Sequence, residues 1–261
     1  EARSRELQRV SDPGLTELAR ALRWRVREQP TSSGPAVEVF ALVREVARRV
    51  LNKPHYPVQL YGGLVMAQGA VAEMQTGEGK TLTATLAAVL RAFAGRGCHV
   101  LTSNDYLAER DADELRPVYQ QLGLSVGCVL PDHDTDQRRA AYACDITYGT
   151  ASEMGFDFLR DRLRREASGA LEESRPAWLQ TTGGGEPPVQ RGHFFALIDE
   201  ADSVLIDEGR TPLIIGLEVP AKATDQVVWD WCRQVAAALQ IVRDYKFDGI
   251  KRSAELTDEG C

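Results

Sequence analysis

The stretch EMQTGEGKTLTATLAAVL holds residues that could bind a phosphate: two glycines, a lysine and a threonine, then an apolar run at helical spacing. A loop between a strand and a helix turns backbone N–H groups toward an anion, and the positive end of the helix dipole adds to the attraction. Here Lys80 would contact the β- and γ-phosphates of a nucleotide, and the Thr81 hydroxyl would ligate Mg²⁺. The predicted contacts in this loop are Thr76, Gly77, Glu78, Gly79, Lys80 and Thr81.

The full phosphate-loop pattern, G-x-x-x-x-G-K-[ST], is only partly met, because Met74 stands where the first glycine would be. An ordinary glycine turn, with Thr81 capping the next helix, is therefore an alternative. The segment GAVAEM (69–74) predicts a strand before the loop, and TLTATLAAVLRAFA (81–94) predicts a helix after it. These two flanking elements favour the phosphate site.

Acidic residues form a second candidate site at the end of HFFALIDEAD (193–202). The apolar run from Phe194 to Ile198 predicts a central parallel strand, and Asp199 and Glu200 follow directly. Asp199 would hold Mg²⁺, directly or through water, and Glu200 would polarise an attacking water. A solvated acidic strand end is the alternative. The acids are far from the glycine loop in sequence, so only a shared sheet could make them neighbours.

Short β-rich runs alternate with helical runs from about residue 69 onward. Strands are predicted in CHVLT (98–102), SVGCVL (125–130), DITYG (145–149) and HFFALIDEAD, with helices over 106–123 and 135–143. This alternation predicts an α/β fold with a mostly parallel sheet flanked by helices. Ligands of such sheets bind at the carboxyl ends of the strands, where TSND, TYGT and DEAD lie with the glycine loop.

Helices are predicted before this region, over residues 1–30 and over AVEVFALVREVARRVL (36–51), with Ser33 as a candidate cap. Val39, Val43, Val46 and Val50 form one apolar stripe on the second helix, and its arginines are predicted to face solvent.

A composition shift after the acidic motif predicts a second domain. The segment 167–190, rich in glycine and proline, is predicted to be a surface insertion. A domain boundary is placed near residue 217, giving domains 1–216 and 217–261. The second begins with a helix over 227–242 and continues as two short strands around Asp248–Gly249, the start of a small α+β domain.

Composition narrows the classes of protein. The 261 residues carry a net charge of −7, which argues against a general nucleic-acid-binding protein. No apolar run reaches the roughly 18 residues of a membrane span, and the first residues lack the apolar core of a signal peptide. The five cysteines are scattered, which indicates reduced thiols in a cytosolic protein.

Four segments together resemble the SecA family, the ATP-driven motors of bacterial preprotein export: residues 58–86, 101–127, 145–161 and 198–216. NDYLAERD, YGTASEMGFDFLRD and LIDEGRTPLII are more specific than generic helicase motifs. Residues 244–260 resemble the hairpin that begins the family's preprotein-binding, or cross-linking, domain. The resemblance implies a RecA-like, DEAD-type P-loop NTPase domain with N-terminal helices over 1–216.

The resemblance also implies roles for matching residues. Gln59 would read the adenine of ATP, and Tyr56 would stack near it. Arg110, with Asp111, matches a motif at the nucleotide rim. Arg210 and Thr211 match a segment that links nucleotide state to the neighbouring domain. The catalytic residues implied are Lys80, Asp199 and Glu200, and the Mg²⁺ ligands are Thr81 and Asp199.

The cofactors implied are ATP and Mg²⁺. The partners implied are preproteins, a SecYEG-type channel, an anionic membrane surface and, as a further option, a second copy of the chain; nucleic acid is not expected. The location implied is cytoplasmic, peripheral to the inner face of the cell membrane.

Some residues depart from the family pattern. Pro57 replaces a common Asp, Gly209 replaces a common Ala, and the 167–190 insertion is longer than usual, which indicates a diverged or accessory member. A second RecA-like domain does not follow within the sequence, so we expect an N-terminal fragment that binds nucleotide with little turnover. Two alternatives remain open: a DEAD-type nucleic-acid helicase domain, and a non-hydrolysing nucleotide-binding module.

Overall fold

The computed structural model describes residues 2–28, 34–167, 187–216, 223–241, 243–248 and 253–257. The chain forms two compact units, Glu1–Ile214 and Ile215–Cys261, which are treated separately below. The predicted cap Ser33 and most of the predicted insertion at 167–190 lie outside the described residues.

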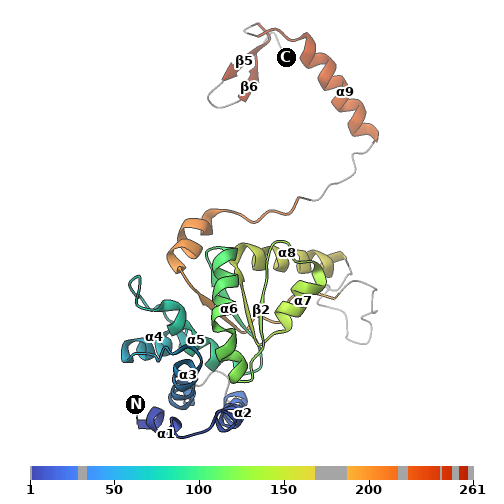
Figure 1. The fold of residues 1–261 in the computed structure, drawn as a ribbon. Coiled ribbons are helices and arrows are strands. Elements are labelled where there is room, and N and C mark those ends of the chain that lie inside the picture. Colours follow the sequence, from blue (N-terminus) through green and yellow to red (C-terminus); the bar gives the residue numbers. More distant parts are fainter. Residues whose placement is uncertain are drawn as a thin grey trace. The chain divides into compact units, whose positions relative to one another are not determined.

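The centre of the first unit is a parallel sheet of four strands in the order β2-β3-β1-β4 (Figure 1). The strands are β1 (Cys98–Thr102), β2 (Val126–Cys128), β3 (Ile146–Thr150) and β4 (Phe195–Ile198). β1 pairs with β3 from Cys98↔Ile146 onward and with β4 from Cys98↔Phe195 onward. Strands β1, β3 and β4 therefore end close together, and the predicted α/β fold is confirmed.

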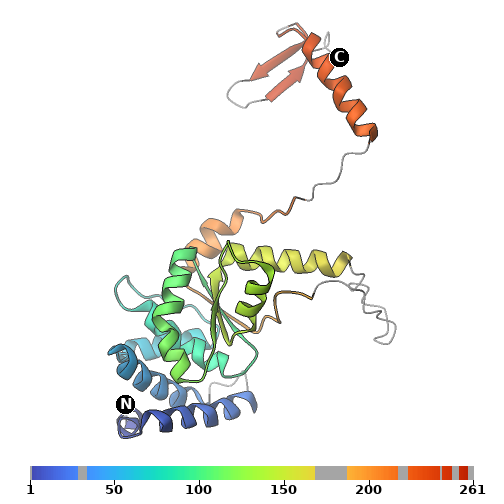
Figure 2. The same ribbon diagram turned by 45° about the vertical axis from the view of Figure 1, so that its right-hand side comes forward.

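Four helices alternate with the strands: α5 (Lys80–Ala92), α6 (Asp105–Gln121), α7 (Thr135–Ala143) and α8 (Ala151–Ala167). In Figure 1, α5 and α6 lie on one side of the sheet and α7 on the other. Capping side chains fix where two of these helices begin. Asn104 caps α6 and Asp134 caps α7, and their side chains accept hydrogen bonds from backbone N–H groups of the first helical turn. Figure 2 shows α8 beginning at the edge of the sheet where β3 ends, the same edge from which residues 199–210 emerge.

An N-terminal layer of helices packs on α5 and α6. It consists of α1 (Ala2–Leu7), α2 (Asp12–Glu28), α3 (Ala36–Leu51) and α4 (Pro57–Ala67). Val39, Val43 and Val46 of the predicted stripe are fully buried, whereas Val50 is exposed. Burial of this apolar face against neighbouring helices stabilises α3 more than helix propensity can.

The prediction that the α3 arginines face solvent is wrong for Arg49. Its side chain is 20% exposed, pairs with Asp12 and Glu45, and donates to the carbonyls of Leu7 and Val10. Arg44 likewise donates to the carbonyl of His55 at 2.8 Å. Periodicity places these arginines correctly on the polar side of the helix, but the chain before α2 and after α3 covers that side.

Two strand predictions also need correction. Residues 70–75 are not in a strand: Gly69 turns the chain at the end of α4 with φ 79°, and Val71 is exposed. β4 was predicted to be central, yet it is an edge strand among the described residues, and Ala196 on it is exposed. An apolar run forms a strand only where a neighbouring strand supplies hydrogen-bond partners. Among the described residues, no strand pairs with residues 70–75, and none pairs with the side of β4 that faces away from β1.

The second unit contains helix α9 (Ala223–Ala238) and an antiparallel pair, β5 (Tyr245–Asp248) and β6 (Ser253–Leu256). The two predicted strands are confirmed, and the turn between them lies outside the described residues. The Asp244 carboxylate accepts from the backbone N–H of Gln240 at 2.8 Å and so fixes the entry to β5. Across both units, no described helix combines the length and apolar character needed to cross a bilayer.

Candidate nucleotide-binding site

The glycine loop leads into the N-terminus of α5. Gly77 and Gly79 have φ angles of 88° and 77°, in the left-handed region that favours glycine. A Cβ on Gly79 would also lie 2.6 Å from Nε2 of Gln59, so a larger residue there would have to displace the end of the Gln59 side chain. A turn with Gln75 accepting from Glu78 N–H at 3.2 Å shapes the loop, and the Glu78 carboxylate accepts from Gln75 N–H at 2.9 Å.

The sheet brings the two predicted motifs together. Nζ of Lys80 lies 3.3 Å from Oε1 of Glu200, although 120 residues separate them. The register of β4 against β1 fixes where the acids leave the sheet, since the backbone N–H of Asp199 extends the ladder by donating to the carbonyl of Leu101 at 2.8 Å. Helix α5, which begins at Lys80, packs against both strands. A phosphate loop and a pair of acids therefore share one edge of the sheet.

The acids have an unusual local environment. Glu200 has φ 55°, a left-handed conformation that is uncommon for a residue other than glycine. Burial raises the pKa of Asp199, and the neighbouring Glu200 charge raises it further, while the Glu200 N–H and the Lys80 charge lower it. Strain and a perturbed carboxylate at one strand end are typical of functional sites. Sequence reasoning located both acids but gave no sign of this backbone conformation.

The predicted adenine-binding residues lie beside the loop. Gln59 is buried; its Oε1 accepts from the backbone N–H of Tyr56 at 2.8 Å, and its Nε2 donates to the carbonyl of Glu78 at 2.8 Å. Tyr56 is 68% exposed, so its ring is accessible for stacking on a flat ligand. The Gln59 amide thus ties the start of α4 to the glycine loop. Its role in reading adenine remains a prediction.

Thr76 lies in the exposed part of the loop, and Thr81 is half-buried on the first turn of α5. Arg110 projects from α6 and donates to the buried carboxylate of Asp111 at 2.6 Å and 2.9 Å. The Asp111 charge is one of the causes that raise the pKa of Asp199, so this pair lies within electrostatic range of the acids. Arg210 ends a short helical turn, η3 (Glu208–Arg210), and is exposed.

In the described part of the chain, no three His, Cys, Asp or Glu side chains are placed to share a metal ion. In nucleotide sites, Mg²⁺ is commonly held by one or two protein oxygens, phosphate oxygens and water. Thr81 and Asp199 supply oxygens of the right chemistry from the two motifs.

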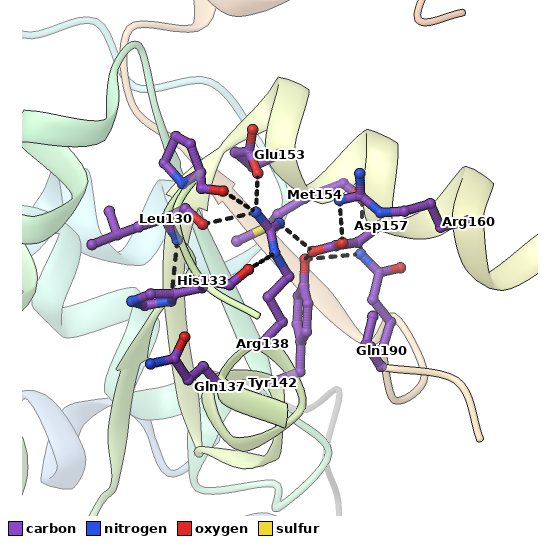
Figure 3. Close-up of polar contacts among 12 residues, drawn as sticks. Leu130, His133, Gln137, Arg138, Tyr142, Glu153, Met154, Asp157, Arg160 and Gln190 are labelled. Carbon is purple, nitrogen blue, oxygen red and sulfur yellow. Dashed lines mark hydrogen bonds and ion pairs between the residues drawn. The ribbon is translucent and has the colours of Figure 1, made fainter. Parts of the chain in front are cut away.

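A buried polar network, which sequence reasoning missed, fixes the position of the segment that leads into β4 (Figure 3). Arg138 on α7 pairs with Asp157 at 3.0 Å and with Glu153 at 2.7 Å, both on α8. Asp161, also on α8 and fully buried, accepts from the backbone N–H groups of Val189 and Gln190 at 2.9 Å. The network ties α7 and α8 to the chain that enters β4, the strand before Asp199 and Glu200.

Fold and site together define the class: a RecA-like α/β domain, with a glycine loop at a helix N-terminus facing acids at a strand end. The family model for the SecA DEAD-like domain matches residues 1–259, and the chain belongs to this family.

Similar proteins carry names from the same family. The chain is 46% identical over 257 residues to protein translocase subunit SecA of Beijerinckia indica, covering 98% of this chain and 24% of that protein. It is 47% identical over 255 residues to protein translocase subunit SecA 2 of Rhodopseudomonas palustris, covering 98% and 28%. It is 42% identical over 260 residues to protein translocase subunit SecA 2 of Rhodopirellula baltica, covering 97% of this chain and 39% of that protein. The chain thus spans 24% to 39% of the length of these relatives. All three relatives are named as protein translocase subunits.

Proposed function

We propose that this chain binds ATP with Mg²⁺ at the edge of the sheet and forms part of the ATPase of a protein translocase. The observation that carries the proposal is the 3.3 Å contact between Lys80 and Glu200, which joins the phosphate loop to the acidic strand end. Membership of the SecA DEAD-like family supports the same conclusion.

Each residue would act through its position. The backbone N–H groups of residues 77–81 face the phosphates at the positive end of α5. Lys80 leaves Glu200 and contacts the β- and γ-phosphates, which frees the Glu200 carboxylate to orient a water and take its proton. Thr81 and Asp199 would hold Mg²⁺, which neutralises charge that develops on the phosphates. Because the charge of Asp199 is poorly solvated, a cation beside it is favourable.

The surroundings of the site suggest further contacts. Tyr56 would stack on the base, Gln59 would hydrogen-bond to it, and Arg110 would lie at the rim. We further propose preproteins as the transported substrate, a SecYEG-type channel and an anionic membrane surface as partners, and a cytoplasmic location at the inner face of the membrane. The names of the relatives as protein translocase subunits support protein transport, and the channel, membrane and location rest on the family resemblance. The assignment of residues 217–261 to a preprotein-binding domain is likewise a proposal from the resemblance of residues 244–260.

Calorimetric titration with ADP and Mg²⁺ tests the proposal. Loss of a charge-assisted contact is worth roughly 1.5–3 kcal/mol, so Lys80→Ala should weaken ADP binding by about tenfold or more. Lys53→Ala is a matched control, because Lys53 pairs with Glu114 on the surface and is 60% exposed. Equal ADP affinity in the Lys80 and Lys53 variants would contradict the site.

Turnover tests the role of Glu200 separately. A glutamine could still orient a water but could not take its proton, so Glu200→Gln should bind ADP and lose phosphate release. Phosphate release is measured with and without the remaining part of a relative's motor, since an arginine from across an interface is typically worth about 10³–10⁵ in rate. Equal phosphate release by the wild-type chain and Glu200→Gln under both conditions would refute the assignment of Glu200.

A further inference from the structure

A buried histidine outside the predicted site ties the adenine side of the site to the phosphate side. His55 has 0% exposure and lies immediately before Tyr56, at the entrance to α4. Its Nε2 lies 2.8 Å from the carbonyl of Leu82 and 3.2 Å from Oγ1 of Thr85, both on α5. A carbonyl can only accept, so Nε2 carries the hydrogen and donates it to Leu82.

The contacts of His55 and Gln59 form two bridges between the same pair of elements. His55 joins the start of α4 to the first turns of α5, and Gln59 joins it to the carbonyl of Glu78, just before α5. Gln59 also accepts from the backbone N–H of Tyr56, the residue between the bridges. The loop holding Tyr56 is thereby fixed from both ends to the backbone on either side of Lys80.

Neighbouring residues hold the histidine rigidly. Its carbonyl accepts from Nε of Arg44 at 2.8 Å, and Pro57 fixes the backbone two residues later, at the first position of α4. Burial lowers the pKa of His55 to about 4, so the ring is neutral at physiological pH. Nδ1 is buried and has no hydrogen-bond partner among the described residues. An unsatisfied buried nitrogen is costly, and a residue that serves only packing could be an apolar one of similar size.

We infer that His55 is a positioning residue for nucleotide recognition: it holds Tyr56 and Gln59 at a fixed distance from the phosphate loop, and so sets the preference of the site for an adenine nucleotide. The inference rests on the proposed nucleotide site and adds to it a residue that touches neither base nor phosphate.

Nucleotide discrimination provides the first test. Calorimetry gives the affinities of ADP, GDP and pyrophosphate for the wild type and for His55→Leu. Loss of one neutral hydrogen bond corresponds to about fivefold in affinity. The ratio of ADP to GDP affinity should fall by about that factor, while pyrophosphate binding changes less than about twofold. An unchanged ratio, or equal weakening of all three ligands, would overturn the inference.

Two conservative variants separate positioning from packing. His55→Gln places an amide N–H where Nε2 stands and should keep the wild-type ratio, whereas His55→Asn places it near Nδ1 and should not. His99→Leu is the matched control: His99 is also buried, with its pKa lowered to about 4 mainly by burial, but it lies on β1 against Tyr142 and His193. Loss of discrimination in His99→Leu, or equal ratios in the Gln and Asn variants, would argue for a general packing effect.

Hydrogen exchange without any ligand tests the bridge independently of nucleotide binding. The amides of Gln59 and Leu60 donate to Tyr56, and that of Thr83 donates to Gly79. His55→Leu and His55→Asn should speed exchange at these three amides by about fivefold, and His55→Gln should not. If the wild type binds none of the three ligands, the proposed function fails and the exchange rates alone decide the bridge. Unchanged exchange in His55→Leu would refute it.

Discussion

Removing Arg138 should destabilise the first unit far more than removing its neighbour Arg139. The Arg138 side chain is 8% exposed, and its partner Asp157 is 1% exposed. Burial lowers the pKa of Arg138, but hydrogen bonds to Glu153 and Asp157 outweigh this, so the net pKa of Arg138 is raised and its guanidinium stays charged. Breaking a buried pair from one side costs about 3–5 kcal/mol, because a buried charge loses its partner.

The lower end of that range applies to Arg138→Met. Asp157 retains the Tyr142 hydroxyl at 2.9 Å and Arg160 at 2.5 Å, and methionine keeps much of the apolar stem of arginine. We therefore expect a loss of about 3 kcal/mol, which lowers the urea midpoint by about 1 M or more. The control Arg139→Met breaks a pair with Asp136, whose side chain is 90% exposed, and should cost at most about 1 kcal/mol.

Urea unfolding followed by far-ultraviolet circular dichroism measures both variants. The double variant Arg138→Met/Asp157→Asn should regain part of the loss, because the buried carboxylate of Asp157 no longer remains without Arg138. Equal midpoints for Arg138→Met and Arg139→Met, or a double variant no better than the sum of the singles, would refute the role given to this network.

Two further predictions concern the sheet and its acidic edge. A Cβ on Gly127 would lie 2.7 Å from the backbone of Ala141, so Gly127→Ala should push α7 away from β2. Thermal unfolding should show a loss of about 1–3 kcal/mol in the free energy of unfolding. The control Gly192→Ala should leave stability unchanged, because a Cβ at Gly192 meets no other atom. A stable Gly127→Ala would show that this contact is loose. The folded protein raises the pKa of Asp199 above its ordinary value of 3.8, so ionisation costs stability once the pH rises above 3.8. Without Mg²⁺, Asp199→Asn should therefore have a higher unfolding midpoint than the wild type at pH 7, and the difference should disappear as the pH falls to 3.8. A lower midpoint for Asp199→Asn than for the wild type at pH 7 would contradict a raised pKa for Asp199.

Local patterns predicted most elements of the first unit. The segments CHVLT, YLAERDADELRPVYQQLG, TDQRRAAYA and DITYG form β1, α6, α7 and β3 as expected, because their periodicity and capping residues agree with the final structure. The prediction that GAVAEM forms a strand is wrong, because apolar content does not supply a hydrogen-bonded neighbour. The pairing of Arg49 with Asp12 and of Arg138 with Asp157 was not predictable, since each partner lies on a different helix.

The sequence by itself determined which residues could bind a phosphate and a metal. Gly77, Gly79, Lys80, Asp199 and Glu200 are recognisable by type and spacing, because glycine, lysine and carboxylate have chemistry that few other residues share. Family membership, too, depends on sequence alone.

Only the tertiary structure decided how these residues meet. The parallel pairing of β1 with β4 fixes the strand end that carries Glu200, and the packing of α5 against both strands brings Lys80 to it. It also gave His55 and Gln59 their contacts with the backbone on either side of Lys80, since those contacts depend on how α4 packs against α5. Distances between side chains that are remote in sequence follow from packing, which no local pattern encodes.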